Sequence, residues 1–171
     1  RRLELAEISY MVTRCGEAEV YAVTRMTRDR DVIIEIQKPD IDTLCQLFQN
    51  DLYVDKDSIF DAIERQGMFN IISNASVFKV DFIVRKEETY RAWEFKRRKR
   101  IKLENIPVWI VAPEDLIISK LFWSKDSISE MQLNDVRNLF SSLDNLDQEY
   151  IEKWIKELKL EAIYEKVKAH A

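Results

Sequence analysis

Residues 27–36 are Thr27-Arg28-Asp29-Arg30-Asp31-Val32-Ile33-Ile34-Glu35-Ile36, and this stretch decides the fold. The apolar run after Asp31 predicts a strand that is buried in a sheet. Because side chains alternate between the two faces of a strand, Asp29 and Asp31 are expected on one face, one pleat apart. Two carboxylates held that close repel each other, and a divalent cation between them removes the repulsion. The stretch therefore predicts a magnesium site of the kind used in phosphoryl transfer.

The same alternation places Arg30 on the expected core face, together with Val32 and Ile34. A buried guanidinium is costly, so Arg30 must extend out to solvent, pair with an acid or destabilise the strand. It is the one residue of the stretch that does not fit a simple buried strand.

A third aspartate lies within a second predicted strand, residues 78–84. The even-numbered residues of this strand are apolar and share one face, and Asp81 lies on the other face. An aspartate inside an apolar strand is costly unless it is paired or binds a metal. If the two strands are neighbours, three carboxylates converge and can hold one or two Mg²⁺ ions. In an alternative that stays open, each aspartate caps a helix or pairs with an arginine.

Composition limits the class of protein. The chain has 171 residues, of which 46% are hydrophobic and 34% charged, and this length and balance suit a globular protein with a real core. Two glycines and three prolines are too few for a sandwich of many tight turns and favour helices joined by polar loops. No apolar run approaches the roughly 20 residues of a membrane span. Cys15 and Cys45 follow no disulfide or metal spacing, so we expect a cytoplasmic protein.

Hydrophobic periodicity predicts a chain of mixed strands and helices followed by helices alone. Asp40 is expected to cap one helix and Gly67 to end the next. Strands are predicted over 10–13, 30–36, 69–73, 77–84 and 106–111, and helices over 15–23, 40–48, 57–67, 87–95, 115–123, 129–142, 147–158 and 161–168.

Five segments together resemble the minimal nucleotidyltransferases of the DNA polymerase beta superfamily, especially the abortive-infection toxin type and its uncharacterised relatives. The aspartate stretch is similar to that family's Arg-x-Thr-x-Asp-hydrophobic-Asp motif. The segments are Tyr10-Met11-Val12-Thr13, Arg25-Met26-Thr27-Arg28-Asp29-Arg30-Asp31, Lys79-Val80-Asp81-Phe82, the helix Ala112-Pro113-Glu114-Asp115-Leu116-Ile117-Ile118-Ser119-Lys120-Leu121, and Asn134-Asp135-Val136 with the helix that follows Leu146-Asp147.

The resemblance implies an α/β (α+β) fold with a small mixed sheet flanked by helices, over residues 1–112, and a C-terminal helical segment over 113–171. It implies that Asp29, Asp31 and Asp81 bind two Mg²⁺ ions and carry catalysis. The family's Gly-Ser turn, which holds the triphosphate, falls at Arg14 and Cys15, with Gly16 one place late. The resemblance implies nucleotide binding by Arg14, Cys15, Gly16, Arg25, Thr27 and Lys120.

The implied reaction moves a nucleoside monophosphate from an NTP to a hydroxyl of RNA (tRNA among the candidates), of a protein or of a small molecule. The main alternative is a catalytically degenerate relative that binds a nucleotide or a partner protein, for instance within a toxin–antitoxin pair. The Arg14-Cys15 replacement favours this alternative.

The basic run, residues 96–102, is the strongest local concentration of charge. It would suit phosphate or an RNA backbone, with contacts from Lys96, Arg97, Arg98 and Arg100; the competing interpretation is a solvated surface. The order Asp81, then Glu94-Phe95-Lys96, is also that of a group of Mg²⁺-dependent nucleases, in which the lysine assists the attacking water. That alternative leaves Asp29 and Asp31 unexplained.

Overall fold

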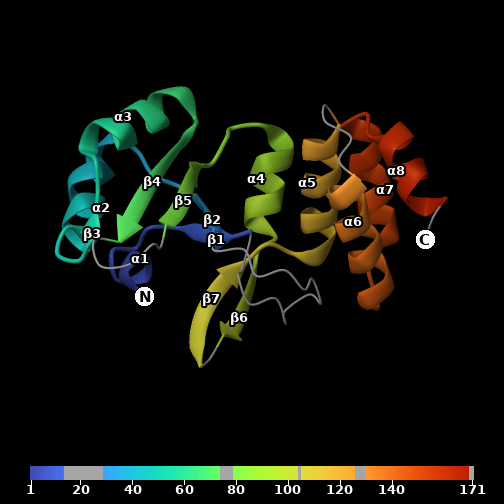
Figure 1. Cartoon of the computed structure of the whole chain (residues 1–171), viewed down its shortest axis with the longest axis horizontal. Helices are drawn as coiled ribbons and strands as arrows, with labels where there is room; N and C mark the ends of the chain where they lie inside the picture. The colour runs from blue at the N-terminus through green and yellow to red at the C-terminus, as the bar shows by residue number, and fades with distance from the viewer. Residues whose placement is uncertain (14–28, 74–78, 104, 126–129, 170–171) are drawn as a thin grey trace. The chain divides into compact units, whose positions relative to one another are not determined.

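The computed structural model describes residues 1–13, 29–73, 79–103, 105–125 and 130–169, and gives only the backbone of Asp29, Arg30, Met131 and Gln132. The described residues form two compact units, one ending at Val111 and the other beginning at Ala112. The first contains the whole described sheet and the second contains helices (Figure 1). The predicted fold class, a mixed sheet flanked by helices with a helical segment after it, is confirmed.

The first unit is built on a mixed sheet in the strand order β3-β4-β5-β2-β1-β7-β6. The two aspartate strands, β2 and β5, are parallel neighbours at its centre. Parallel pairs also join β1 to β7, and the remaining pairs are antiparallel. The strands are β1 Tyr10–Val12, β2 Asp29–Ile34, β3 Leu52–Tyr53, β4 Met68–Ser73, β5 Lys79–Val84, β6 Lys99–Leu103 and β7 Ile106–Ile110.

Apolar side chains at alternate positions of the central strands share one face of the sheet, and that face is buried. Phe82 of β5 stacks on Phe69 of β4 with ring centroids 5.3 Å apart, and Phe48 of α2 lies 6.1 Å from Phe82. Each buried phenylalanine stabilises the fold by roughly 1.5–3 kcal/mol. Helices α2 and α3 supply the rest of this core, so the residues between the core positions face the opposite side. The helical elements of this unit are α1 Arg2–Leu5, the 3-10 turn η1 Lys38–Asp40, α2 Ile41–Phe48, α3 Lys56–Arg65 and α4 Thr89–Lys96.

Two predicted helix ends differ in detail from the structure. Asp40 is the N-cap residue of α2, as predicted, but its carboxylate accepts the backbone N–H of Gln37 (2.7 Å) in the η1 turn and makes no capping hydrogen bond to α2. The residue in left-handed conformation after α3 is Gln66, with a φ of 48°, and not Gly67. The Gly67 N–H still donates to the carbonyl of Ala62 (2.9 Å). This bond satisfies one of the carbonyl groups in the last turn of α3 that have no partner within the helix.

The edge strand β6 was not predicted. Its sequence shows little alternation between polar and apolar residues, and Lys99, Arg100 and Lys102 are all exposed. Charged side chains are a common protection of an edge strand against pairing with another chain. Asn105 follows with a φ of 67°, a conformation that asparagine tolerates, and begins the return into β7.

The second unit is a group of helices, α5 Pro113–Ser124, α6 Glu130–Ser142, α7 Gln148–Glu157 and α8 Glu161–Lys168. The predicted apolar stripe of α7 is confirmed, since Ile151, Trp154 and Ile155 are buried. Asp147 caps this helix by accepting the N–H of Tyr150 at 2.9 Å. In the part of the chain that the structure describes, every helix is too short or too polar to cross a membrane.

Candidate functional site

The predicted site lies on the side of the central strands opposite the aromatic core. Asp31 of β2 is directly opposite Asp81 of β5 in the parallel register. Neighbouring strands are about 4.8 Å apart, so two facing carboxylates are within reach of one cation. Both side chains are partly buried, and that of Asp81 is 13% exposed. The expectation that the two aspartate strands are neighbours is therefore confirmed.

A second register pair lies one pleat away. Asp29, the first residue of β2, is opposite Lys79 of β5. The Lys79 Nζ lies 3.1 Å from Oδ1 of Asp81. That oxygen is buried and has no hydrogen bond to any described residue, so the lysine contact is a charge interaction outside hydrogen-bond geometry. The carboxylate thus keeps an oxygen that is suited to a further cation.

The row extends to β4, where Asn70 is directly opposite Asp81. Asn70 is exposed, and directly opposite residues of an antiparallel pair share a face. Sequence reasoning missed Asn70, because an amide in a strand of alternating polarity is indistinguishable from an ordinary surface residue. Its position next to a central carboxylate was visible only after the strand order was known.

The donor set fits a hard divalent cation. Mg²⁺ prefers carboxylate oxygens and retains several waters, and such oxygens are offered by Asp31 and by Oδ1 of Asp81, which accepts no hydrogen bond from the described residues. Among the side chains that the structure describes, no three acids, histidines or cysteines lie close enough to hold a metal. The carboxylate of Asp29 is not among those side chains.

Most of the predicted nucleotide-binding residues lie outside the described part of the chain. This holds for Arg14, Cys15, Gly16, Arg25 and Thr27, and the side chain of Arg30 is likewise not described. Their roles stay predictions.

Lys120 is described, on α5, and its Nζ lies 3.1 Å from Oδ2 of Asp135 on α6. Two positions that the sequence resemblance singled out separately are thus joined by an ion pair within the second unit. The pair is partly buried, with side chains 21% and 18% exposed. Whether Lys120 also meets a triphosphate stays a prediction.

The acids at the start of α5 have structural contacts. Pro113 occupies the first turn, as expected, and Glu114 and Asp115 follow it. Oδ1 of the fully buried Asp115 accepts the hydroxyl of Tyr150 at 2.7 Å, and Oε1 of Glu114 accepts the N–H of Asp147 at 3.4 Å. These carboxylates complement the helix dipole and tie α7 to α5.

The basic run is divided among the end of α4, a short connection and the start of β6. Lys96 ends α4, Arg97 and Arg98 connect, and β6 begins at Lys99. The Arg98 guanidinium lies 4.3 Å from the ring centre of Phe95 and 4.9 Å from that of Trp109, and its Nη1 donates to the Phe95 carbonyl at 2.7 Å.

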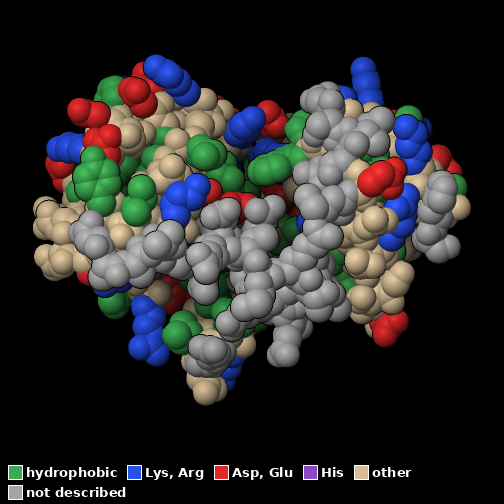
Figure 2. Space-filling view, in the orientation of Figure 1, with side chains coloured by type: hydrophobic (Ala, Val, Ile, Leu, Met, Phe, Trp, Pro, Cys, Tyr) green, Lys and Arg blue, Asp and Glu red, His purple; other side chains and the backbone are tan. Residues whose placement is uncertain are grey.

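Burial lowers the pKa of Arg98 from its ordinary value, because it disfavours the charged form. Arg100 pairs with Glu4 at 3.2 Å. In the view of Figure 2, Lys and Arg side chains are scattered among acidic and hydrophobic ones over the described surface. Two of the four predicted nucleic-acid contacts, Arg98 and Arg100, therefore have partners within the fold.

The nuclease alternative needs Glu94 and Lys96 side by side, and the structure does not place them so. Glu94 and Lys96 lie on the helix α4, where residues two apart point in nearly opposite directions. Glu94 is 1% exposed and pairs with Arg91 at 2.8 Å, whereas Lys96 is exposed and lies over the ring of Trp93. The glutamate is a structural partner of Arg91 and does not share a face with the lysine.

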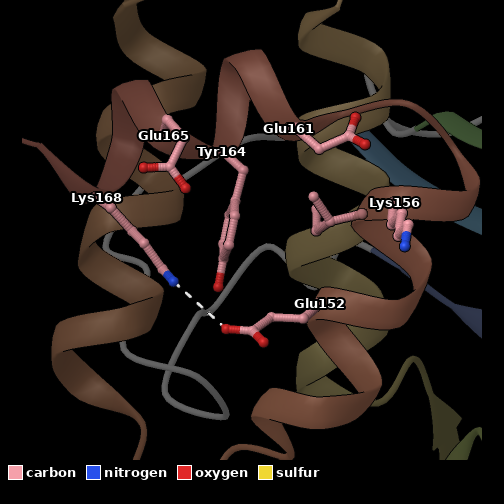
Figure 3. A pocket seen from close by; sticks show the side chains of 7 residues that line it. Glu152, Lys156, Glu161, Tyr164, Glu165 and Lys168 are labelled. Atoms are coloured by element: carbon pink, nitrogen blue, oxygen red, sulfur yellow. Dashed lines mark ion pairs between the residues drawn. The ribbon is translucent and has the colours of Figure 1, made fainter.

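A small pocket lies between α7 and α8 of the second unit (Figure 3). Its wall includes Tyr164, Glu152 and Lys168, with the Lys168 Nζ 3.6 Å from Oε1 of Glu152. None of its lining residues belongs to the predicted site.

Comparison with solved structures identifies the fold. A lincosamide antibiotic adenylyltransferase, LnuA, in a lincomycin-bound crystal structure, superposes with a TM-score of 0.53 at 11% identity, over 82% of this chain and 91% of that chain. The chain has a nucleotidyltransferase-like fold. Its central strands are those that carry Asp31 and Asp81.

Two further solved structures match this nucleotidyltransferase-like chain with a TM-score of 0.49 each. One is an antigenic nucleotidyltransferase-like protein from Paracoccidioides brasiliensis, at 15% identity over 98% of this chain and 88% of that chain. The other is the antibiotic-resistance factor ANT(2'')-Ia, at 12% identity over 99% and 90%. No protein-family model and no curated protein matches the sequence.

Proposed function

We propose that the chain is a Mg²⁺-dependent nucleotidyltransferase that moves a nucleoside monophosphate from an NTP to a hydroxyl acceptor. One observation carries the proposal: Asp31 and Asp81 are directly opposite each other on parallel central strands. The nucleotidyltransferase-like fold supports it, because that fold class contains an adenylyltransferase. Asp29, two residues before Asp31 on the same strand, completes the ligand set.

The reaction forms a bond between the acceptor oxygen and the α-phosphorus of the NTP. The bond from that phosphorus to the bridging oxygen breaks, and pyrophosphate leaves with the electron pair. Asp29 and Asp31 would hold two Mg²⁺ ions, which would supply charge neutralisation of the phosphates and a lower pKa for the acceptor hydroxyl. Asp81 would act on that hydroxyl, either as a further metal ligand or as the acceptor of its proton.

The acceptor is a hydroxyl of RNA, of a protein or of a small molecule, and the reaction is placed in the cytoplasm. Arg14, Cys15, Gly16, Arg25, Thr27 and Lys120 are the residues proposed to hold the nucleotide.

The test is incubation with Mg²⁺, each α-labelled NTP, and three acceptor pools: total RNA, protein, and the small-molecule fraction of a cell lysate. The matched control is the double variant Asp31→Asn/Asp81→Asn, which keeps side-chain shape and removes both charges. Label transfer by the native chain that the variant lacks would identify the reaction and its acceptor together.

The competing proposal is a degenerate relative that binds the nucleotide or a toxin–antitoxin partner without transfer. The departure from the family turn at Arg14 and Cys15 favours it. Calorimetry separates the two, because saturable binding of Mg²⁺ and NTP without label transfer to any pool would support the degenerate protein.

A further inference from the structure

Four positions of two neighbouring strands form a square in the sheet. Asp29 and Asp31 are its corners on β2, and Lys79 and Asp81 are their register partners on β5. Three of these corners are the proposed metal ligands. The fourth, Lys79, brings a positive charge to a square whose other three corners are aspartates.

The ammonium of Lys79 lies beside the carboxylate of Asp81. Its Nζ is 3.1 Å from the buried Oδ1 of Asp81, and its side chain is 40% exposed, so the ammonium can leave toward solvent without unfolding the strand. Lysine is a flexible point charge on a four-carbon stem and does not fix a carboxylate as a bidentate arginine would.

We propose that Lys79 is a built-in cation that competes with the divalent metal for Asp81 and thereby sets the metal concentration at which the site fills. The inference rests on the proposed function, because it assumes that Asp81 is a metal ligand. When the metal is absent, the ammonium offsets the repulsion between Asp31 and Asp81. When the metal binds, the ammonium moves away from Oδ1.

Competition between the ammonium and the metal predicts the direction in which metal affinity changes when the lysine is replaced. A unit charge beside a divalent ion opposes binding, and a ligand atom that is already occupied must first be released. Removal of the ammonium should therefore tighten metal binding by roughly tenfold, on Coulomb's law at a partly solvated site. A lysine whose ammonium lies beyond the reach of the metal's charge would leave the metal affinity unchanged.

The experiment is calorimetric titration of Mg²⁺, with Mn²⁺ by electron paramagnetic resonance as a second probe, into the native chain and into Lys79→Met. Methionine keeps an unbranched stem and removes the charge. Lys102→Met, at an exposed position of the edge strand β6, removes the same charge elsewhere and is the matched control. Circular dichroism establishes that each variant is folded.

The expected result is tighter binding in Lys79→Met, little change in Lys102→Met, and loss of the gain when Asp81→Asn is added to Lys79→Met. If the native chain binds the metal and a folded Lys79→Met binds it equally well or more weakly, the proposed competition is overturned. The metal site of the proposed function is not affected by that result. If neither the native chain nor Lys79→Met binds the ion, the metal site of the proposed function fails and the competition fails with it.

Discussion

Asp81 has a buried carboxylate oxygen that accepts no hydrogen bond from the described residues, with a lysine ammonium beside it. Such an oxygen is costly in a folded protein unless a cation neutralises it. Asp81 lies on the face of β5 opposite the core residues Phe82 and Val84, so it takes no part in the apolar core. At the scale of the single residue, Asp81 is therefore the side chain at which the proposed metal site can be tested most directly.

The first prediction concerns Asp81→Asn. The variant keeps the size of the side chain but loses the negative charge that a metal requires, so label transfer should fall roughly a hundredfold or more. Its metal-free unfolding free energy should change by less than about 1 kcal/mol, because loss of the Lys79 contact is offset by relief of repulsion from Asp31. Initial transfer rates and urea unfolding measure the two effects. Unchanged transfer in Asp81→Asn would contradict the assignment.

At the scale of the element, part of the basic run has a structural role in the segment from α4 to β7. Arg98 packs on two aromatic rings and donates to the Phe95 carbonyl, and so connects the end of α4 to β7. We predict that Arg98→Ala lowers the free energy of unfolding by about 1–3 kcal/mol, from lost cation–π and hydrogen-bond contacts. Urea unfolding is the measurement.

Two variants sharpen that prediction. Arg98→Lys should recover less than half of the loss, because an ammonium cannot stack as a guanidinium does. Lys99→Ala, at an exposed position, should stay within about 0.5 kcal/mol of the native chain. If Arg98→Ala kept full stability and instead weakened binding to total tRNA, the nucleic-acid role predicted from the sequence would be supported.

The junction of α5 with α7 depends on a buried acid. Tyr150 donates to the fully buried Asp115, and Tyr150→Phe removes this donor without changing the ring. The expected cost is about 1–2 kcal/mol in the free energy of unfolding, the penalty of removing a buried hydrogen bond. Tyr53→Phe, with an exposed hydroxyl-bearing ring on β3, is the control and should be close to neutral. Equal stability of both variants would show that the Tyr150 hydroxyl is dispensable.

The elements differ in how well the sequence predicted them. Strands with a clear apolar run, such as β2 and β5, and helices with a clear stripe, such as α7, were predicted because their periodicity reflects burial. The strand β6 was not, since charge at an edge obscures alternation, and β3 is too short to carry a pattern. For the candidate site, spacing singled out Asp31 and Asp81, whose roles stay predictions, whereas the positions of Lys79 and Asn70 beside Asp81 became evident only through the register of three strands.

At the scale of the whole molecule, the chain is acidic, with a formal net charge of −4, and several of the basic side chains that the structure describes have partners within the fold. Lys79, Lys120, Arg98 and Arg100 each have an acidic or aromatic partner. This distribution favours a cation as the species attracted to the carboxylate row. It gives less support to broad electrostatic attraction of a nucleic acid, which needs a basic surface.

Binding of that cation should stabilise the native state as a whole. An ion that binds the folded but not the unfolded chain adds about 1.4 kcal/mol when its free concentration is ten times the Kd, which corresponds to a Tm increase of roughly 3–6 °C for a chain of this size. We therefore predict that Mg²⁺ raises the Tm in differential scanning calorimetry and that EDTA reverses the increase. Asp31→Asn/Asp81→Asn should show no increase, and NaCl at equal ionic strength should not reproduce it in the native chain. An equal increase in the double variant would place the ion elsewhere on the protein and remove the metal from the proposed reaction.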